Sequence, residues 1–348
     1  MPESFEVMTG ARPPLVYIVV LHWKDYDHTR AAIDSILETA YQNYRLIVVD
    51  NGSQNGSVEA LQREFSGLTF QVNQTNLGFS KGCNVGIRQA LKDPGCAYVL
   101  LMNNDATMAP GALPAAVAAA EADSTIGIVS GKVLWSRPPH TIWYAGGRID
   151  HWRGQAVVRG FGEIDRGQYD TAGETGFATG ALMLIKRAVL TTVGLLSEEY
   201  FFGVEEWDFS ERTRRAGFKL YYLPRFLGYH AADGSHWNYD PKFVYNSYRN
   251  KLIFQENYLP RLVFPFWKVA FAVYGKHLAR RARRRLIGKK VFQLPRPVQF
   301  DHLDFALAKA IRDHGKNHLS EAVLDSFEAE MQLHFEVKDG VKTLGHVR

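Results

Sequence analysis

The chain has 348 residues, of which 46% are hydrophobic and 22% are charged, so its composition is that of an ordinary folded soluble protein. Its formal net charge is +5, but residues 276–290 alone carry eight Lys and Arg side chains. Because this basic excess is local, it does not indicate a nucleic-acid-binding surface over the whole chain, and we expect no nucleic-acid partner.

Apolar runs alternate with helical periodicities through the first 135 residues. The runs typical of strands lie at 15–21, 45–50, 68–72, 97–102 and 127–135. The segments with helical spacing lie between them, at 31–40, 58–65, 81–91 and 110–122. This alternation predicts an α/β protein with a mostly parallel sheet and right-handed crossovers. Ligands of such sheets bind at the carboxyl ends of the strands, so candidate site residues are sought there.

The second half of the chain is less regular. Residues 181–194 are predicted to form a strand followed by a helix, and 218–224 a late strand. Helical spacing returns at 239–258. The composition changes after this helix, which predicts one domain over 1–260 and a helical C-terminal region over 261–348.

Polar residues follow several of the predicted strands. Asp50 ends the second strand and is followed by Asn51, Gly52 and Ser53. A carboxylate there can accept hydrogen bonds from a nucleobase, and the glycine lets a planar base approach the backbone. The same residues also suit an ordinary turn capped by an Asx side chain, and the pattern alone favours the turn.

The segment NLGFSKGCNVG (76–86) places Gly78, Gly82 and Gly86 at four-residue spacing where a helix is predicted to begin. A helix N-terminus favours a diphosphate, and small residues would let the helix pack closely under a ligand. The same spacing is also common where a helix simply packs against its neighbours.

Asn103, Asn104 and Asp105 follow the strand predicted at 97–102. A single carboxylate can hold a hard divalent cation when a nucleotide diphosphate supplies further oxygen ligands. Asn and Asp also favour the N-cap of a following helix, and PGAL comes soon after. Considered alone, the cap is the better interpretation.

Glu205, Glu206 and Asp208 cluster just before another predicted helix. Three close carboxylates repel one another, which raises the pKa of at least one and is unfavourable for a purely structural surface. Acidic residues in the first turn of a helix are, however, also favoured by the helix dipole. Both interpretations remain open from the residues alone.

Considered in order, these segments resemble the family 2 glycosyltransferases, in particular their rhamnosyltransferase-like branch. The resemblance runs from about residue 15 to 255. It rests on LHWKDYDHTRAAIDSIL, YQNYRLIVVDNGSQNGS, TNLGFSKGCNVGIRQAL, YVLLMNNDATMAPGAL, YAGGRID, TGALMLIKRAVL, YFFGVEEWDFSERTRRAGF, and the segment from YHAADGSH to RNKLIF. It implies the GT-A fold, a Rossmann-like, mostly parallel sheet flanked by helices. It also implies inverting transfer of a sugar from a nucleotide-diphosphate donor to a saccharide or lipid-linked saccharide hydroxyl. The branch makes dTDP-rhamnose the first donor to test, followed by other dTDP- and UDP-sugars.

The resemblance further implies a role for each candidate residue. Asp50 would contact the nucleobase. The other residues implied on the donor side are Asn51, Gly52, Ser53, Asn76, Gly78, Gly82, Asn84, Asn103 and Asn104. Asp105 would bind Mn²⁺ or Mg²⁺, with His230 near the metal and the diphosphate. Glu206 falls at the position of the catalytic base, and Asp208 is its rival. Asn55 departs from the family's usual Asp.

Two other functions share features with this one. A nucleotidyltransferase also joins a nucleotide-binding sheet to a metal carboxylate, but HWKDYD (22–27) does not supply the basic, glycine-rich phosphate loop that it usually needs. A non-catalytic sugar-nucleotide or nucleic-acid binder would bind its ligand without transferring a sugar.

The segment 264–290 joins apolar and aromatic residues to the basic run, which suits contact with an anionic membrane surface. An ordinary helical subdomain with a solvated basic face is equally consistent. Pro265 and Lys268 interrupt the apolar part, so no membrane-spanning helix is expected. Two unclustered cysteines and an N-terminus without a signal peptide favour the cytoplasm, at the inner face of the cell membrane if the segment binds lipid.

Overall fold

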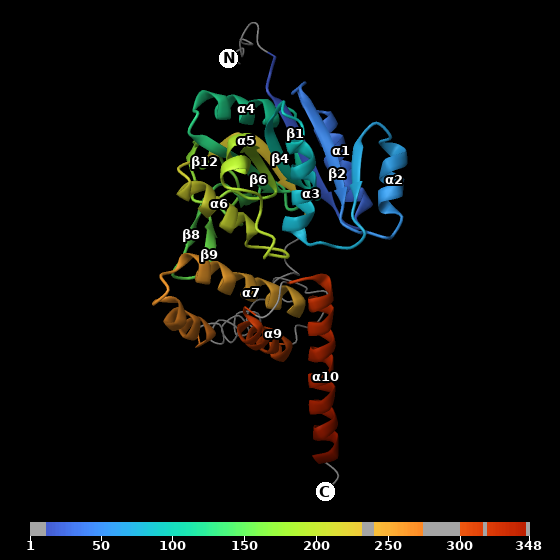
Figure 1. The fold of residues 1–348 in the computed structure, drawn as a ribbon, viewed down its shortest axis with the longest axis vertical. Helices are drawn as coiled ribbons and strands as arrows, with labels where there is room; N and C mark the ends of the chain where they lie inside the picture. The colour runs from blue at the N-terminus through green and yellow to red at the C-terminus, as the bar shows by residue number, and fades with distance from the viewer. Residues whose placement is uncertain (1–11, 232–239, 274–299, 316–318, 346–348) are drawn as a thin grey trace.

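The computed structural model describes residues 12–231, 240–273, 300–315 and 319–345 (Figure 1). The first half contains β1 (Leu15–His22), α1 (Tyr26–Leu37), β2 (Tyr44–Asp50), α2 (Ser57–Glu64), β3 (Thr69–Val72), α3 (Phe79–Leu91), β4 (Cys96–Asn103), β5 (Ala106–Met108), α4 (Ala112–Ala122) and β6 (Ile126–Trp135). The second half contains β7 (Ile142–Tyr144), β8 (Gly147–Asp150), β9 (Gln155–Val158), β10 (Gly173–Glu174), β11 (Leu182–Lys186), α5 (Arg187–Thr192), α6 (Glu205–Arg215), β12 (Lys219–His230), α7 (Pro241–Tyr258), α9 (Phe300–Asp313) and α10 (Glu321–Gly345).

The central sheet has the strand order β10-β12-β6-β11-β4-β1-β2-β3. The strands β4, β1, β2 and β3 are parallel to one another, and β6 is parallel to β12, whereas β11 is antiparallel to both of its neighbours. The sheet is therefore mixed but mostly parallel, as the sequence predicts. Apolar side chains cover both faces of β1 and β4, which explains their continuous hydrophobic runs.

The structure corrects two sequence predictions at the end of β4. The helix predicted from residue 110 begins at Ala112 with Gly111 as its N-cap, and the short strand β5 separates it from Asp105. The interpretation of Asp105 as a helix cap is therefore wrong. The late strand also extends beyond residue 224, because pairing with β6 resumes after an irregularity and continues to His230.

The helix α7 packs against both parts of the chain. Val244 and Tyr245 share an apolar cluster with Phe201 and with α9 and α10 residues such as Ala306 and Phe327. The predicted division near residue 260 therefore does not coincide with a break in packing. In Figure 1, α7, α9 and α10 lie beyond one end of the sheet.

Residues 264–273 form a further helix with one buried and one exposed apolar face. Its buried residues Phe264, Trp267 and Phe271 pack on Leu252 of α7. Within the residues that the structure describes, no helix combines the length and the hydropathy needed to cross a membrane. The N-terminal residues 1–11 and the basic run at 276–290, on which two sequence expectations depend, lie outside the described residues.

Candidate active site

Three polar strand ends meet at one edge of the sheet. In the parallel pairs, His22 of β1 lies opposite Asp50 of β2, and Leu21 lies opposite Asn103 of β4. The residues that follow these strands are therefore brought together. This is the edge at which the sequence predicts ligand binding.

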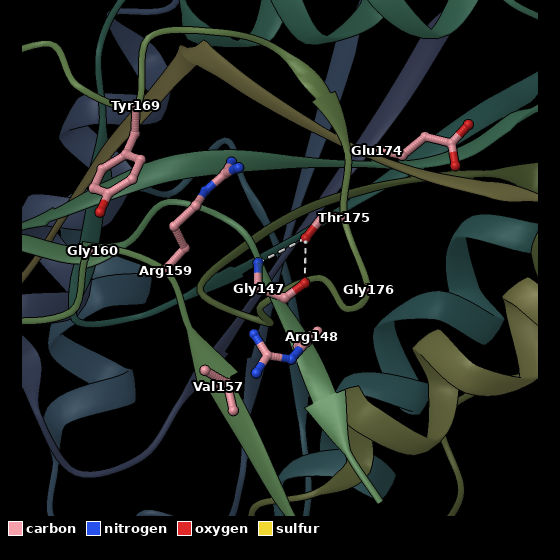
Figure 2. Close-up of a pocket in the computed structure, with 9 residues that line it drawn as sticks. All are labelled: Gly147, Arg148, Val157, Arg159, Gly160, Tyr169, Glu174, Thr175 and Gly176. Carbon is pink, nitrogen blue, oxygen red and sulfur yellow. Dashed lines mark hydrogen bonds between the residues drawn. The ribbon is translucent and has the colours of Figure 1, made fainter.

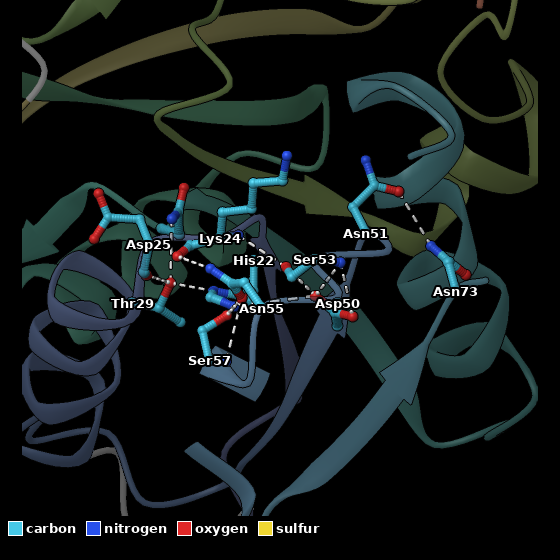
Figure 3. A network of polar contacts seen from close by, with 11 residues as sticks. His22, Lys24, Asp25, Thr29, Asp50, Asn51, Ser53, Asn55, Ser57 and Asn73 are labelled. Atoms are coloured by element: carbon cyan, nitrogen blue, oxygen red, sulfur yellow. Dashed lines mark hydrogen bonds and ion pairs between the residues drawn. The ribbon is translucent and has the colours of Figure 1, made fainter. Parts of the chain in front are cut away.

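Asp50 is fixed by a buried polar network beneath this edge (Figure 3). Asp50 is 1% exposed, and its carboxylate accepts hydrogen bonds from the backbone N–H and the hydroxyl of Ser53. Nε2 of His22 lies 4.0 Å from Asp50 Oδ1, and the imidazole also contacts the hydroxyls of Thr29 and Ser57, each at 2.7 Å. Burial lowers the pKa of His22, against the opposing effect of Asp50, which favours a neutral ring.

Asn55 completes the turn after β2. Its amide nitrogen donates to the carbonyl of Lys24 at 2.9 Å, and its amide oxygen accepts from the hydroxyl of Ser57 at 2.6 Å. An Asp carboxylate could not donate the first of these hydrogen bonds. The Asn at this position, where the family usually has Asp, is therefore accommodated by hydrogen bonds to its neighbours.

Asn51 joins this turn to the loop before α3. Its amide nitrogen donates to Asn76 Oδ1 at 2.8 Å and to the carbonyl of Gly78 at 3.1 Å. Gly52 has φ +74°, and a Cβ there would come within 2.5 Å of the Thr75 backbone. Gly78 has φ +80°, and a Cβ there would meet the carbonyl of Phe201 at 2.4 Å. Both positions therefore require glycine.

The glycines inside α3 serve packing. A Cβ on Gly82 would lie 2.6 Å from Leu21, and one on Gly86 would lie 2.4 Å from Val19. Asn84 is fully buried, and its amide bonds the backbone of Leu196 in both directions and the Glu198 carboxylate. Of the two interpretations of this glycine spacing, the geometry favours close packing of the helix on β1.

Asp105 and His230 lie side by side at the same edge. Asp105 Oδ1 is 3.3 Å from His230 Nε2, and the Asn103 amide nitrogen is also 3.3 Å from that ring atom. The imidazole stacks on Trp143 with a centroid distance of 4.6 Å. Burial lowers the pKa of His230, while the Asp105 carboxylate acts in the opposite direction.

Asn104, between Asn103 and Asp105 in the sequence, makes a different contact. Its amide nitrogen donates to the Thr29 hydroxyl at 3.1 Å, which links the segment Asn103–Asp105, here called the β4 tip, to the polar network around Asp50.

This tip has donor atoms that suit a hard cation. The Asn103 amide oxygen is buried without a hydrogen-bond partner, so it leaves an acceptor unsatisfied beside the Asp105 carboxylate. Among the described residues, no cluster of three His, Cys, Asp or Glu side chains could hold a metal ion by itself. A cation here would depend on oxygen ligands from a substrate, as is usual for Mg²⁺ bound with phosphates.

Glu206 projects from the start of α6 toward the same edge. Its Oε2 accepts the Gly180 N–H at 2.5 Å, and burial raises its pKa to about 7. The next residue, Ala181, accepts from the Asn103 N–H at 3.4 Å. A short backbone segment therefore connects the Glu206 carboxylate to the tip that carries Asp105.

The two neighbouring carboxylates have different surroundings. Asp208 pairs with Arg212 at 2.8 Å and accepts the hydroxyl of Tyr258 at 2.7 Å, so it is already neutralised. Glu205 is 5% exposed, and its Oε2 has no hydrogen-bond partner. Burial and the nearby Glu206 raise the pKa of Glu205 to about 8.

Sequence reasoning missed several supporting residues. His22 could have been suspected because it ends a buried strand beside Asp50. Thr29, Ser57, Trp143 and Tyr258 carry no local sequence signal, because their roles depend on contacts with residues far along the chain.

Residues 17–194 match the model of the family described as glycosyl transferase family 2. The uncharacterized protein y4gI of Sinorhizobium fredii is 29% identical over 65% of this chain, but the match spans only 25% of that protein's length. A second relative is the N-acetylglucosaminyl-diphospho-decaprenol L-rhamnosyltransferase of Mycobacterium tuberculosis. It is 23% identical over 60% of this chain and 73% of its own length.

Two solved structures show the same fold. The chain resembles GalNAc-T7 in complex with UDP, GalNAc and Mn²⁺, with a TM-score of 0.55 and 14% identity, over 70% of this chain and 48% of that one. It also resembles the mannosyltransferase PcManGT of Pyrobaculum calidifontis in complex with GDP-Man and Mn²⁺, with a TM-score of 0.53 and 17% identity. That match covers 92% of this chain and 81% of the other. The predicted GT-A fold with a helical C-terminal region is therefore confirmed.

Proposed function

This chain belongs to glycosyl transferase family 2, and we propose that it is an inverting glycosyltransferase that moves a sugar from a nucleotide-diphosphate donor to a saccharide hydroxyl. The observation that carries the proposal is the position of Glu206. Its carboxylate is held by the Gly180 N–H, one residue from the backbone contact between Ala181 and the Asn103–Asp105 tip. An inverting transfer needs a base on one side of the sugar and charge stabilisation at the departing diphosphate on the other.

Glu206 is the proposed base. It takes the proton of the acceptor hydroxyl while that oxygen bonds to the anomeric carbon and the bond from this carbon to the diphosphate oxygen breaks. Its pKa of about 7 suits a group that must bind and release a proton near neutrality. Asp208 is a poor candidate for this role, because Arg212 and Tyr258 already occupy its oxygens.

The donor would lie along the strand ends. The turn Asn51–Ser53, positioned by Asp50, would face the nucleobase, and the loop of Asn76 and Gly78 would face the ribose and diphosphate. We assign Gly82 and Asn84 to the packing that holds this loop. Asp105, Asn103 and His230 would hold Mn²⁺ or Mg²⁺, and the cation would neutralise charge that develops on the leaving diphosphate.

The relative from Mycobacterium tuberculosis supports a rhamnosyl donor and a lipid-linked saccharide as the acceptor class, and dTDP-rhamnose is the first donor to test. Other dTDP- and UDP-sugars are the next candidates. Donor binding stabilises the folded state by mass action, so a thermal-shift panel of nucleotide sugars with Mn²⁺ identifies the donor.

A lipid-linked acceptor would favour an enzyme on the cytoplasmic face of the cell membrane, and the helix at 264–273 offers a surface for this. Phe266, Val269 and Val273 on its outward side, and Leu262 in the turn before it, are 66–86% exposed and follow helical spacing. The sequence that follows adds the eight basic residues of 276–290. Apolar side chains next to a basic run complement an anionic lipid surface, which is the occupant we propose for this face.

The function is tested by measuring donor hydrolysis and sugar transfer with and without Mn²⁺ or Mg²⁺. We expect both activities to depend on the cation and to be lost in Asp105→Ala. Asp304→Ala, at an exposed position of α9, is the matched control and should retain both. Full activity of Asp105→Ala would contradict the proposed site. Binding of nucleotide sugars without hydrolysis or transfer would instead indicate a non-catalytic binding protein.

A further inference from the structure

An aromatic cluster lies beside the β4 tip, and none of the roles assigned so far uses it. The His230 ring stacks on Trp143 with a centroid distance of 4.6 Å and an angle of 4° between the ring planes. Trp135 meets both rings edge-on, at 6.3 Å from His230 and 6.4 Å from Trp143. The imidazole therefore has one aromatic ring against its face and a second perpendicular to it.

Three strands bring these rings together. In the parallel pair of β6 and β12, Trp135 lies directly opposite His230. Trp143 comes from β7, which is antiparallel to β6. Its neighbours Ile142 and Tyr144 are 0% and 1% exposed and belong to the core, so the alternation of side chains along a strand turns Trp143 away from them. The contact between Trp143 and His230 is thus a product of strand pairing.

The backbone that carries Trp143 is anchored beyond the end of β7. The Ala145 carbonyl accepts a hydrogen bond from Arg159 Nε at 2.6 Å. The Gly147 N–H donates to Thr175 Oγ1 at 2.9 Å, a bond that Figure 2 shows beside the hollow of about 360 Å³ at the β8–β9 hairpin. Trp143 therefore projects from a fixed strand and not from a long loop.

The polar contacts of His230 described above act on a single atom of its ring. Asp105 Oδ1 and the Asn103 amide nitrogen each lie 3.3 Å from Nε2. The χ2 torsion of a histidine has only broad preferences, so the side chain itself does not fix the plane of the ring. Stacking on Trp143 does fix that plane. Since the lone pair of an imidazole nitrogen lies in the ring plane, the stacking also fixes the direction in which Nε2 can bind a cation.

We propose that Trp143 is a positioning residue for the cation site, because its ring holds His230 Nε2 toward the Asp105 carboxylate. This inference rests on the proposed function, in which Mn²⁺ or Mg²⁺ binds at the β4 tip. It adds that cation affinity depends on an aromatic side chain that is not itself a ligand. Loss of a residue that orients a metal-binding histidine typically lowers metal affinity by about 10–100-fold.

The test measures how strongly Mn²⁺ enhances nucleotide binding. The Kd of dTDP, and in parallel that of UDP, is measured by calorimetry in EDTA and at one fixed Mn²⁺ concentration, and the ratio of the two values reports the cation site. We expect Trp143→Leu, which keeps an apolar side chain but removes the flat ring, to lower this ratio about tenfold. The Kd in EDTA should stay unchanged, because the contacts of the strand ends with the nucleotide remain. Trp143→Phe retains a ring that can stack and should keep a ratio close to that of the wild type.

Two comparisons separate a positioning role from a merely structural one. Trp152→Leu, at a tryptophan between β8 and β9 that is 74% exposed, is the matched control and should change neither Kd. In a double-mutant cycle, Trp143→Leu should have little further effect on the ratio in the His230→Ala background. Asp105 and Asn103 remain in that background, so part of the Mn²⁺ effect should persist and can be measured. An equal loss in both backgrounds would show that Trp143 does not act through His230 and would overturn the proposal.

The other outcomes distinguish this inference from the proposed function. An unchanged ratio in Trp143→Leu, or a wild type whose nucleotide binding is not enhanced by Mn²⁺, would overturn the role of Trp143 even if sugar transfer is established. If Mn²⁺ enhances binding and Trp143→Leu reduces the enhancement, but no donor is hydrolysed or transferred, the positioning role stands and the glycosyltransferase function fails.

Discussion

At the residue scale, the three acidic side chains at the start of α6 illustrate what sequence reasoning cannot separate. Glu205, Glu206 and Asp208 are chemically alike and adjacent, yet one is buried without a partner, one contacts the Gly180 backbone, and one is neutralised by Arg212. These differences arise from residues far along the chain. The sequence therefore identified the acidic cluster but left the proposed base open between Glu206 and Asp208.

The raised pKa of Glu206 leads to a pH dependence. A base must be deprotonated to act, so activity should increase as the pH rises through about 7 and be small at pH 5. The measurement is kcat/KM between pH 5 and 9 at saturating cation. A profile that is flat from pH 5 to 8 would contradict the assignment of Glu206.

The buried carboxyl of Glu205 leads to a prediction about stability. Its pKa is raised to about 8 in the folded state, above the ordinary value of 4.5 that the unfolded chain retains. The folded state therefore holds the proton more tightly, and the stabilisation is complete below pH 4.5 and is lost as the pH rises to about 8. Glu205→Gln removes this loss, so its melting temperature should exceed that of the wild type by a few degrees at pH 8 and match it near pH 5. An equal shift at both pH values would argue against a titrating Glu205.

At the element scale, the parallel strands and the helices between them could be predicted because their hydrophobic periodicity is local. The length of β12 could not, because Pro224 resembles the end of a strand and the pairing with β6 resumes only at Leu227. That continuation brings His230 to Asp105. The short strand β5 was missed for a similar reason, since its three residues pair with the end of β12 and have no periodicity of their own.

The helix α7 positions the loop that leads into α6. Asn250 donates to the carbonyls of Phe202 and Gly203, at 2.9 and 2.8 Å, and Asn246 also bonds the Phe202 carbonyl. Val204, which follows this loop, has φ +80°, so the turn before Glu205 and Glu206 is strained and needs support.

We expect Asn250→Ala to lower kcat by about tenfold with little change in donor affinity, because a small displacement of a catalytic group is costly while the donor contacts are untouched. Ser247→Ala, on the same helix, is the control. The measurements are steady-state kinetics and donor binding by calorimetry. Equal losses of kcat and donor affinity would indicate general unfolding of the site instead of a displaced base.

At the scale of the whole molecule, the fold class and the edge at which polar strand ends meet could be predicted from the sequence, because eight segments occur in the family order and polar residues follow adjacent strands. The role of the C-terminal region could not, because it depends on contacts between distant elements. Tyr258 reaches Asp208, and Gln255 bonds the carbonyl of His151 in the β8–β9 hairpin. The helical region thus contacts both α6 and the β8–β9 hairpin.

The exposed apolar face of the 264–273 helix predicts membrane binding. We expect the protein to sediment with vesicles that contain phosphatidylglycerol, and Phe266→Glu/Val269→Glu to weaken this binding at least about tenfold through lost apolar burial. Val72→Glu, at a residue of β3 that is 57% exposed, serves as the control. Unchanged sedimentation of the double variant would exclude this face, and a change in oligomeric state without lipid binding would show that another copy of the chain covers it.

The role of Glu206 as the base of a glycosyl transfer is tested by one comparison of the wild type with Glu206→Gln. Transfer rate and donor affinity are measured on the same preparations with the donor that the thermal-shift panel identifies. We expect Glu206→Gln to bind the donor as the wild type does and to transfer the sugar about 10²–10⁴-fold more slowly, the range of a lost general base. A variant that binds the donor and transfers at the wild-type rate would contradict it.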